Sequence, residues 1–109
     1  MPSDLRPGRC RACEGGVALL AEAEIRAALA ELPQWSLQDQ GLERRFHFRN
    51  FYETMAFVNT LAWIAHREDH HPDLQVSYNT CLVRFSTHAV GGVTENDVIC
   101  VRAVEQLLA

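Results

Sequence analysis

Apolar residues recur at helical spacing in three segments of the chain. In residues 21–32 they fall every three or four positions, and a longer stripe of the same kind runs through residues 51–69. A third stripe begins after Thr94, which can cap a helix because Asp97 stands three positions later. The pattern therefore predicts three helices, each with one apolar face.

Alternation of apolar and polar positions marks four shorter segments between these helices. Residues 35–38 and 42–48 alternate on either side of a turn that contains Gly41, and residues 74–78 and 81–85 alternate around a polar turn. Strands joined by such short connections pair in antiparallel fashion. We therefore expect two β-hairpins.

The predicted order of elements is α-β-β-α-β-β-α. This order favours an α+β fold in which three helices cover one face of a four-stranded antiparallel sheet. A small sheet of this kind has exposed edges, and pairing with a second subunit is a common way to cover them. We expect a homo-oligomer, either a homodimer or a homotetramer.

Composition bounds the size of the fold and the kind of partner. The chain has 109 residues, of which 48% are hydrophobic, enough for one core. We predict a flexible N-terminal tail over residues 1–16 and a single domain over residues 17–109. The net charge of −4, with no stripe of Lys and Arg, argues against direct binding of nucleic acid. No apolar run could span a membrane and no secretory signal is recognisable, so we expect a cytoplasmic protein with no membrane partner.

The chain contains four cysteines, Cys10, Cys13, Cys81 and Cys100, which we expect to be reduced thiols. Cys10 and Cys13 form a Cys-x-x-Cys pair, which is half of a zinc or redox signature. No second pair of close ligands is evident, and the glycines on both sides place the pair in the tail. We interpret the pair as adventitious thiols in an accessory tail.

Three histidines stand beside predicted chain reversals: His70, His71 and His88. Pro72 disfavours helical geometry at His71 and so ends the second helix near this pair, whereas His88 follows the end of the fourth strand. The predicted topology can bring these reversals together, and imidazoles exchange protons near neutral pH. The sequence predicts a metal-free acid–base site; the alternative is that these histidines form a solvated helix end and a strand end.

A zinc site is the competing interpretation of the same residues. His66 and His70 lie four positions apart on one helix, and His88 could complete a three-histidine site. However, no Glu follows His66 in the metalloprotease arrangement, and a group of histidines that transfers protons needs no metal. We predict no metal.

The spaced run formed by these residues resembles the signature of the pterin-4a-carbinolamine dehydratases. The residues of the run are His66, His70, His71, Pro72, Tyr78, His88 and Asp97. Segments around Trp35, Phe46 to Phe51 and Ser86 to His88 also look like that family, so the resemblance covers about residues 17–109.

The resemblance implies dehydration of a 4a-hydroxytetrahydropterin to the quinonoid dihydropterin, a step of pterin recycling. It implies His70, His71 and His88 as catalytic residues, with His70 and His88 as the acid–base groups and His71 mainly holding the substrate. It also implies no cofactor, because the pterin is the substrate. The residues that would bind the pterin are Asp69, His70, His71, Ser86, Thr87 and His88. Those that would support the site are His66, Pro72, Tyr78 and Asp97, although Asp97 has the alternative of being only a helix-start residue.

The chain departs from the animal members of that family at three places. His66 stands where those members usually carry glutamate, and Leu74 where they have tryptophan. Ala89 and Val90 replace a Glu-Cys pair. We expect these changes to affect rate and substrate preference rather than to remove catalysis, since every histidine of the run is present.

The resemblance also extends to members without enzymatic activity, which act as protein-binding coactivators or assembly factors. A pure binding module has no reason to keep three histidines together with Pro72 and Tyr78. The sequence therefore favours the enzyme and leaves a partner-binding role as the alternative.

Overall fold

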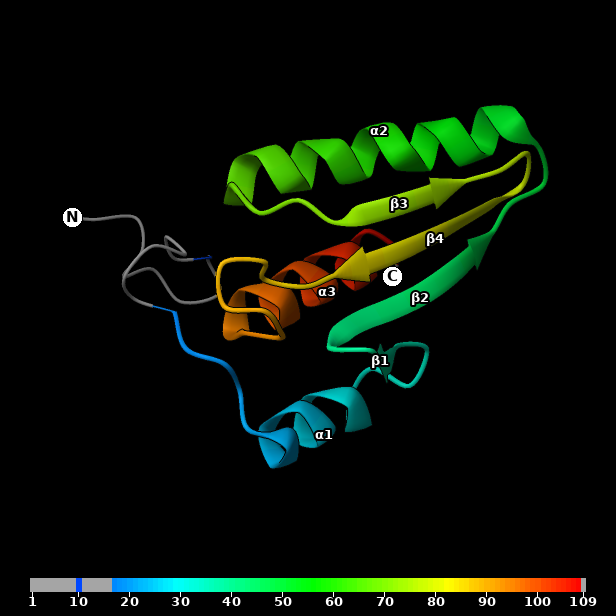
Figure 1. Ribbon diagram of the computed structural model, residues 1–109. Helices are drawn as coiled ribbons and strands as arrows, with labels where there is room; N and C mark the ends of the chain where they lie inside the picture. The colour runs from blue at the N-terminus through cyan, green and yellow to red at the C-terminus, as the bar shows by residue number, and fades with distance from the viewer. Residues whose placement is uncertain (1–9, 11–16, 109) are drawn as a thin grey trace.

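The computed structural model describes residue 10 and residues 17–108 of the chain. In these residues three helices and four strands follow one another in the order predicted from the sequence (Figure 1). Their bounds are α1 Glu22–Ala30, β1 Ser36–Gln38, β2 Gly41–His47, α2 Phe51–Glu68, β3 Asp73–Val76, β4 Thr80–Phe85 and α3 Glu95–Leu108.

The four strands form one antiparallel sheet in the order β1-β2-β4-β3. The two hairpins are joined in the middle of the sheet by β2 and β4, with Leu42 opposite Phe85 and Phe46 opposite Cys81. β3 pairs with β4 on its other side and is an edge strand, as is β1. The predicted α+β fold with a four-stranded antiparallel sheet is confirmed.

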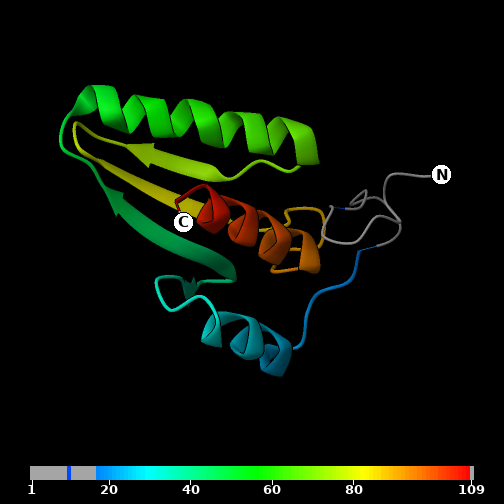
Figure 2. The ribbon, with the colours of Figure 1, turned by 180° about the vertical axis from the view of Figure 1, so that it is seen from behind.

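All three helices lie on one side of the sheet, which is clearest from behind, where α3 crosses in front of the strands (Figure 2). Alternate residues of β4 point into the core, so Cys81, Val83 and Phe85 are buried and their neighbours are half-buried. α3 meets this face with Val101 and Val104, which are fully buried. Burial of such apolar side chains is the main favourable contribution to folding.

A partly buried polar contact joins the sheet to the last helix. Trp35 precedes β1, and its indole N–H donates a 2.8 Å hydrogen bond to Glu105 of α3. The same carboxylate oxygen accepts a hydrogen bond from Arg44 of β2. The indole ring lies in the core, so this carboxylate satisfies a donor that would otherwise be buried without an acceptor.

The ends of the elements differ from the predicted ones by a few residues. The second strand runs over 41–47 rather than 42–48, and the third over 73–76 rather than 74–78. Of the predicted tail over residues 1–16, only Cys10 lies in the described part of the chain; Cys13 lies outside it. None of the helices in the described residues is long and apolar enough to cross a membrane.

Candidate active site

The first part of the site is built by the way α2 ends. Asp69 adopts a left-handed conformation with φ of 52°, and its N–H caps the helix at the carbonyl groups of Ala65 and His66. The N–H of His70 then donates to Ala65 as well, at 3.0 Å, which completes a tight helix terminus. The helix therefore stops at Glu68, and His70 lies just past its last turn, where the reversed chain turns the imidazole inward.

His70 is only 7% exposed, and a buried carboxylate holds its ring. Its Nε2 lies 2.6 Å from Oδ1 of Asp97, which is fully buried. Because a carboxylate accepts hydrogen bonds, Nε2 carries the proton in this contact. The ring also stacks on Phe85, with centroids 6.1 Å apart and planes within 13°. The orientation of the imidazole is thus fixed on two sides.

Asp97 serves both as a helix-start residue and as the partner of His70. Its Oδ2 accepts the N–H of Thr94 and the hydroxyl of Thr87, both at 2.8 Å, while Oδ1 contacts His70. The hydroxyl of Thr94 lies 2.8 Å from that of Thr87 and completes this network. The two interpretations of Asp97 offered by the sequence are therefore compatible.

His71 and His88 face each other at the rim of the site. Their ring centroids lie 6.3 Å apart and the planes are nearly perpendicular. His88 begins a tight loop that closes when the N–H of Thr87 donates to Gly92 at 2.8 Å. Its Nε2 lies 3.5 Å from a carboxylate oxygen of Asp73, the first residue of β3. Asp73 was not predicted as a site residue, although its place directly after Pro72 puts it next to the histidine pair.

A cleft of about 170 Å³ lies between these elements, where α2 ends, β3 begins and β4 ends. All six residues predicted to bind substrate line it, together with Ala89. They are Asp69, His70, His71, Ser86, Thr87 and His88. The structure therefore brings together three imidazoles that lie on two segments about 17 residues apart, and it does so by the same reversals that the sequence predicted.

The two hydroxyl residues of the cleft direct their hydrogens at protein acceptors. Ser86 donates to the carbonyl of Gln40 at 3.1 Å, and Thr87 donates to Asp97. Thr87 is almost fully buried. The hydroxyl of Thr87 thus fixes the carboxylate that holds His70.

A second, more apolar hollow of about 400 Å³ adjoins the cleft. It shares Asp69, His70 and His71 with the cleft and extends between α2 and the start of β3. The residues that it adds are Leu61, Ala62, Ala65, His66, Pro72 and Leu74. Two of the departures from the animal dehydratases, His66 and Leu74, therefore line one wall beside the predicted site.

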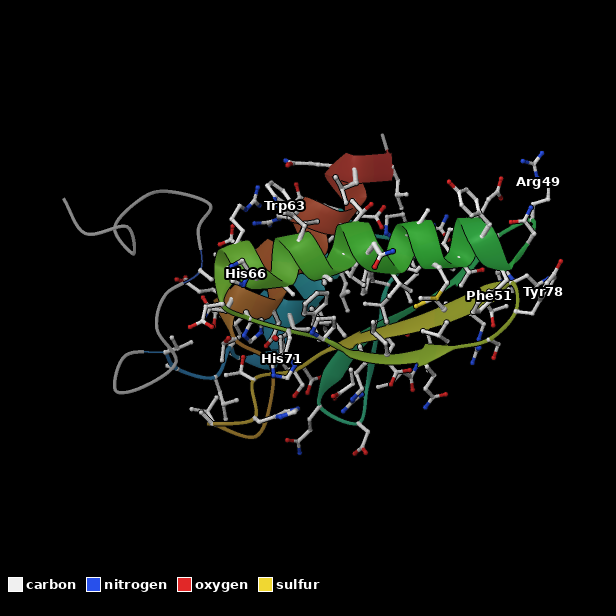
Figure 3. The ribbon with its side chains drawn as sticks, turned by 90° about the horizontal axis from the view of Figure 1, so that it is seen from above. Arg49, Phe51, Trp63, His66, His71 and Tyr78 are labelled. Carbon is white, nitrogen blue, oxygen red and sulfur yellow. The ribbon has the colours of Figure 1, made fainter. Side chains whose placement is uncertain are left out.

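Tyr78, predicted as a supporting residue, lies far from the cleft. Figure 3 shows His66 and His71 at one end of α2 and Tyr78 at the other, near Phe51. The Tyr78 side chain is 63% exposed, and its carbonyl accepts a 2.9 Å hydrogen bond from Thr54 of α2. In this structure Tyr78 contributes to the link between the β3–β4 turn and the helix.

The three-histidine zinc alternative finds no support in the geometry. Over residue 10 and residues 17–108, no three side chains of His, Cys, Asp or Glu are placed to hold a metal ion together. His66 lines the adjoining hollow, whereas His88 lines only the cleft.

The fold and the site define the class of protein: an α+β sandwich with a histidine-lined cleft at one end of its sheet. The chain belongs to the pterin 4 alpha carbinolamine dehydratase family, whose sequence profile matches residues 18–107. The resemblance inferred from the histidine run is confirmed.

Relatives and a solved structure agree with this assignment. A protein of Nitrosomonas eutropha is 51% identical over 96% of this chain and 94% of its own length, and one of Legionella pneumophila is 49% identical over 99% and 98%. Both are provisionally named pterin-4-alpha-carbinolamine dehydratase. A crystal structure of a transcriptional coactivator/pterin dehydratase from Brucella melitensis has a TM-score of 0.80 and 32% identity, covering 84% of this chain and 100% of that one. Dehydratases are hydro-lyases, so the prediction of an enzyme of this class is confirmed.

Proposed function

We propose that this protein dehydrates a 4a-hydroxytetrahydropterin to the quinonoid dihydropterin by general acid–base catalysis of its histidines. The observation that carries the proposal is the meeting of three imidazoles in one cleft, one of them held by the buried carboxylate of Asp97. The family and the names of the relatives supply the substrate class.

The reaction needs two proton transfers and no change in oxidation state. The bond between C4a and the hydroxyl oxygen breaks, and the oxygen takes a proton from an acid and leaves as water. The electron pair of the neighbouring ring nitrogen forms the new C=N bond, and the proton of that nitrogen passes to a base. One group must therefore start protonated and the other neutral, which two imidazoles can do near neutral pH.

His70 and His88 are the proposed acid–base pair. Nε2 of His70 lies 2.6 Å from the Asp97 carboxylate, which orients the imidazole for the proposed proton transfer. His88 lines the same cleft, and its Nε2 lies 3.5 Å from the Asp73 carboxylate. His71 lies between the cleft and the adjoining hollow, which suits the proposed role of holding the substrate.

The test is the rate of dehydration of chemically generated 4a-hydroxytetrahydropterin, followed by ultraviolet absorbance against the spontaneous reaction. We expect acceleration by the native chain and a loss of about 10²- to 10⁴-fold in His88→Ala, which removes an exposed ring. His47→Ala is the matched control, because His47 is an exposed histidine on β2 outside the cleft. A native rate equal to the spontaneous one contradicts the proposal.

A partner-binding role is the second candidate, since the similar Brucella melitensis protein is titled both a coactivator and a dehydratase. α2 exposes three large aromatic side chains, Phe51, Tyr52 and Trp63. If the native chain fails to accelerate dehydration although it is folded, this role is favoured over the enzyme.

We also propose that the protein forms a homodimer or homotetramer, as expected from the sequence. The supporting feature is the edge strand β3, all four residues of which are exposed, including Leu74 and Val76. Light scattering coupled to size exclusion tests it, and a monomer at micromolar concentration contradicts it. The cytoplasmic location is a separate prediction, which fractionation of the source cells tests.

A further inference from the structure

Two cysteines that lie 90 positions apart in the sequence meet beside the site. The Sγ atoms of Cys10 and Cys100 are 3.6 Å apart. Cys100 is fully buried on α3, and Cys10 is half-buried. The third free cysteine of the described residues, Cys81, is buried in β4.

Cys10 is anchored at this place by contacts from two helices. Its N–H donates a 2.9 Å hydrogen bond to Glu68 at the end of α2, and its thiol lies 3.5 Å from the carbonyl oxygen of Asn96 in α3. Its side chain also packs against the hydrophobic core. The proximity of the two sulfur atoms therefore belongs to a set of contacts rather than to one side chain alone.

We propose that Cys10 and Cys100 are a redox-active pair that closes to a disulfide when a low-molecular-weight disulfide, such as oxidised glutathione, is present. A disulfide bond is about 2.05 Å long, so closure requires the two sulfur atoms to approach by roughly 1.5 Å. Cys100 is fixed in a packed helix, and so the movement belongs to Cys10. Cys10 of the Cys-x-x-Cys pair would thus form its disulfide with Cys100 rather than with Cys13.

Cys10 is half-buried and Cys100 is fully buried, so Cys10 reacts first with oxidised glutathione. The Cys10 sulfur, as thiolate, attacks oxidised glutathione, which forms a mixed disulfide at Cys10 and releases one glutathione. The Cys100 sulfur, after losing its proton to solvent, then attacks Sγ of Cys10 and displaces the second glutathione. Two protein thiols are oxidised and one molecule of glutathione disulfide is reduced to two thiols.

The second step becomes faster as the pH rises. In the reduced protein the hydrogen bond with Cys10, followed by burial, raises the pKa of the Cys100 thiol. In the mixed disulfide Cys10 has no thiol, and burial is the cause that persists. The Cys100 thiolate is therefore scarce at neutral pH, and closure from the mixed disulfide accelerates with increasing pH.

The disulfide would link Cys10 covalently to the first turns of α3, which carry Asp97. Cys100 lies one turn from Asp97, and its Sγ lies 3.9 Å from the carbonyl oxygen of His70. Closure therefore links the N-terminal segment to the region where α2 ends and α3 begins. A cross-link between positions so distant in sequence restricts the unfolded chain strongly, so the oxidised protein unfolds at a higher temperature.

The experiment treats the full chain with oxidised glutathione at about pH 8, blocks remaining thiols by alkylation, and measures intact mass and disulfide-linked peptides. We expect the loss of two hydrogen atoms, a peptide linking Cys10 to Cys100, and a Tm about 5 °C or more above that of the reduced protein. Cys13→Ser and Cys81→Ser are the matched controls and should both retain the bond and the Tm shift.

Cys10→Ser should lose the bond and the shift, and it changes a half-buried residue rather than the helix core occupied by Cys100. A disulfide between Cys10 and Cys13 overturns the proposal. So does a glutathione that stays attached to Cys10 while Cys100 remains alkylatable after unfolding.

Discussion

At the scale of single residues, Asp97 joins the start of a helix to the candidate catalytic base or acid. One carboxylate oxygen caps α3 at Thr94, and the other holds Nε2 of His70. A buried carboxylate is costly unless it is fully hydrogen-bonded, and the hydroxyl of Thr87 and the backbone N–H of Thr94 meet that requirement. Removing the charge of Asp97 should therefore lower mainly kcat, whereas removing the capping hydroxyl of Thr94 should lower mainly the free energy of unfolding.

Asp97→Asn tests the charge, since an amide oxygen can still accept the N–H of Thr94. We expect kcat for dehydration to fall at least about tenfold, because the ring of His70 loses its ionised partner. Thr94→Ala is the matched change, which removes the capping hydroxyl that accepts from Asn96. It should cost about 1 kcal/mol in the free energy of unfolding and leave kcat within a factor of about two. Equal effects of both variants on kcat would show that Asp97 acts only through the fold.

At the scale of elements, the end of α2 sets the position of both neighbouring histidines through one residue, Asp69. Its left-handed φ of 52° is tolerated by Asp, Asn and Gly but strained for most other residues. Asp69 also lines the cleft and the adjoining hollow. The same residue is thus proposed to shape the helix end and to contact substrate.

Substitutions at Asp69 separate these two roles. Asp69→Ala should lower the free energy of unfolding by about 1 kcal/mol, whereas Asp69→Gly and Asp69→Asn should change it little. All three remove the carboxylate, so all three should raise KM for the pterin by a similar factor. Urea denaturation and steady-state kinetics measure the two quantities. An unchanged KM in the Asn and Gly variants would rule out a role of the carboxylate in binding.

The contact between the sheet and α3 depends on Glu105, which accepts from Trp35 and Arg44. Glu105→Ala leaves the buried indole N–H without this acceptor, and we expect a loss of about 1–3 kcal/mol in the free energy of unfolding. Glu105→Gln keeps an acceptor and should lose less. The rate of dehydration should be unchanged in both, since Glu105 does not line the cleft. An equal loss in both variants would place the effect in the ion pair with Arg44 rather than in the indole contact.

At the scale of the whole molecule, the elements could be predicted because each buries one face. Periodicity of 3.6 and of 2 is a property of neighbouring residues, and so the three helices and four strands follow from local pattern. The capping role of Asp97 is local as well, because Thr94 stands three residues before it. The gathering of the histidines was inferred from chain reversals and from resemblance together.

The remaining features depend on tertiary packing. The contact between His70 and Asp97 spans 27 positions and exists because the end of α2 meets the start of α3. No local signal indicates the stacking of His70 on Phe85, the approach of Asp73 to His88, or the meeting of Cys10 and Cys100. Tyr78, by contrast, was expected to support the site because of its place in the histidine run, but it lies at the end of α2 away from the cleft.

Stability should fall in alkaline solution because of buried thiols. Burial raises the pKa of the Cys81 thiol, so the unfolded chain loses this proton at a lower pH than the folded chain does. The contribution of the protonated Cys81 thiol to the free energy of unfolding is fully present below the ordinary thiol pKa of about 8.5. It decreases as the pH rises above that value. Under reducing conditions, Cys81→Val should make the decline between about pH 8.5 and 10 shallower, by up to about 1.4 kcal/mol per pH unit. An identical slope in urea titrations of both proteins would contradict this expectation.

The most direct test of acid–base catalysis by His70 and His88 is kcat/KM for dehydration of 4a-hydroxytetrahydropterin, measured across neutral pH for the native chain, His70→Ala and His88→Ala. We expect a bell-shaped profile for the native chain, because one imidazole must be protonated and the other neutral. Each variant should lose about 10²-fold or more at the optimum and lose one limb of the bell, with folding intact by circular dichroism. A native rate no faster than the spontaneous one, or variants with the native profile, would contradict acid–base catalysis by this cleft.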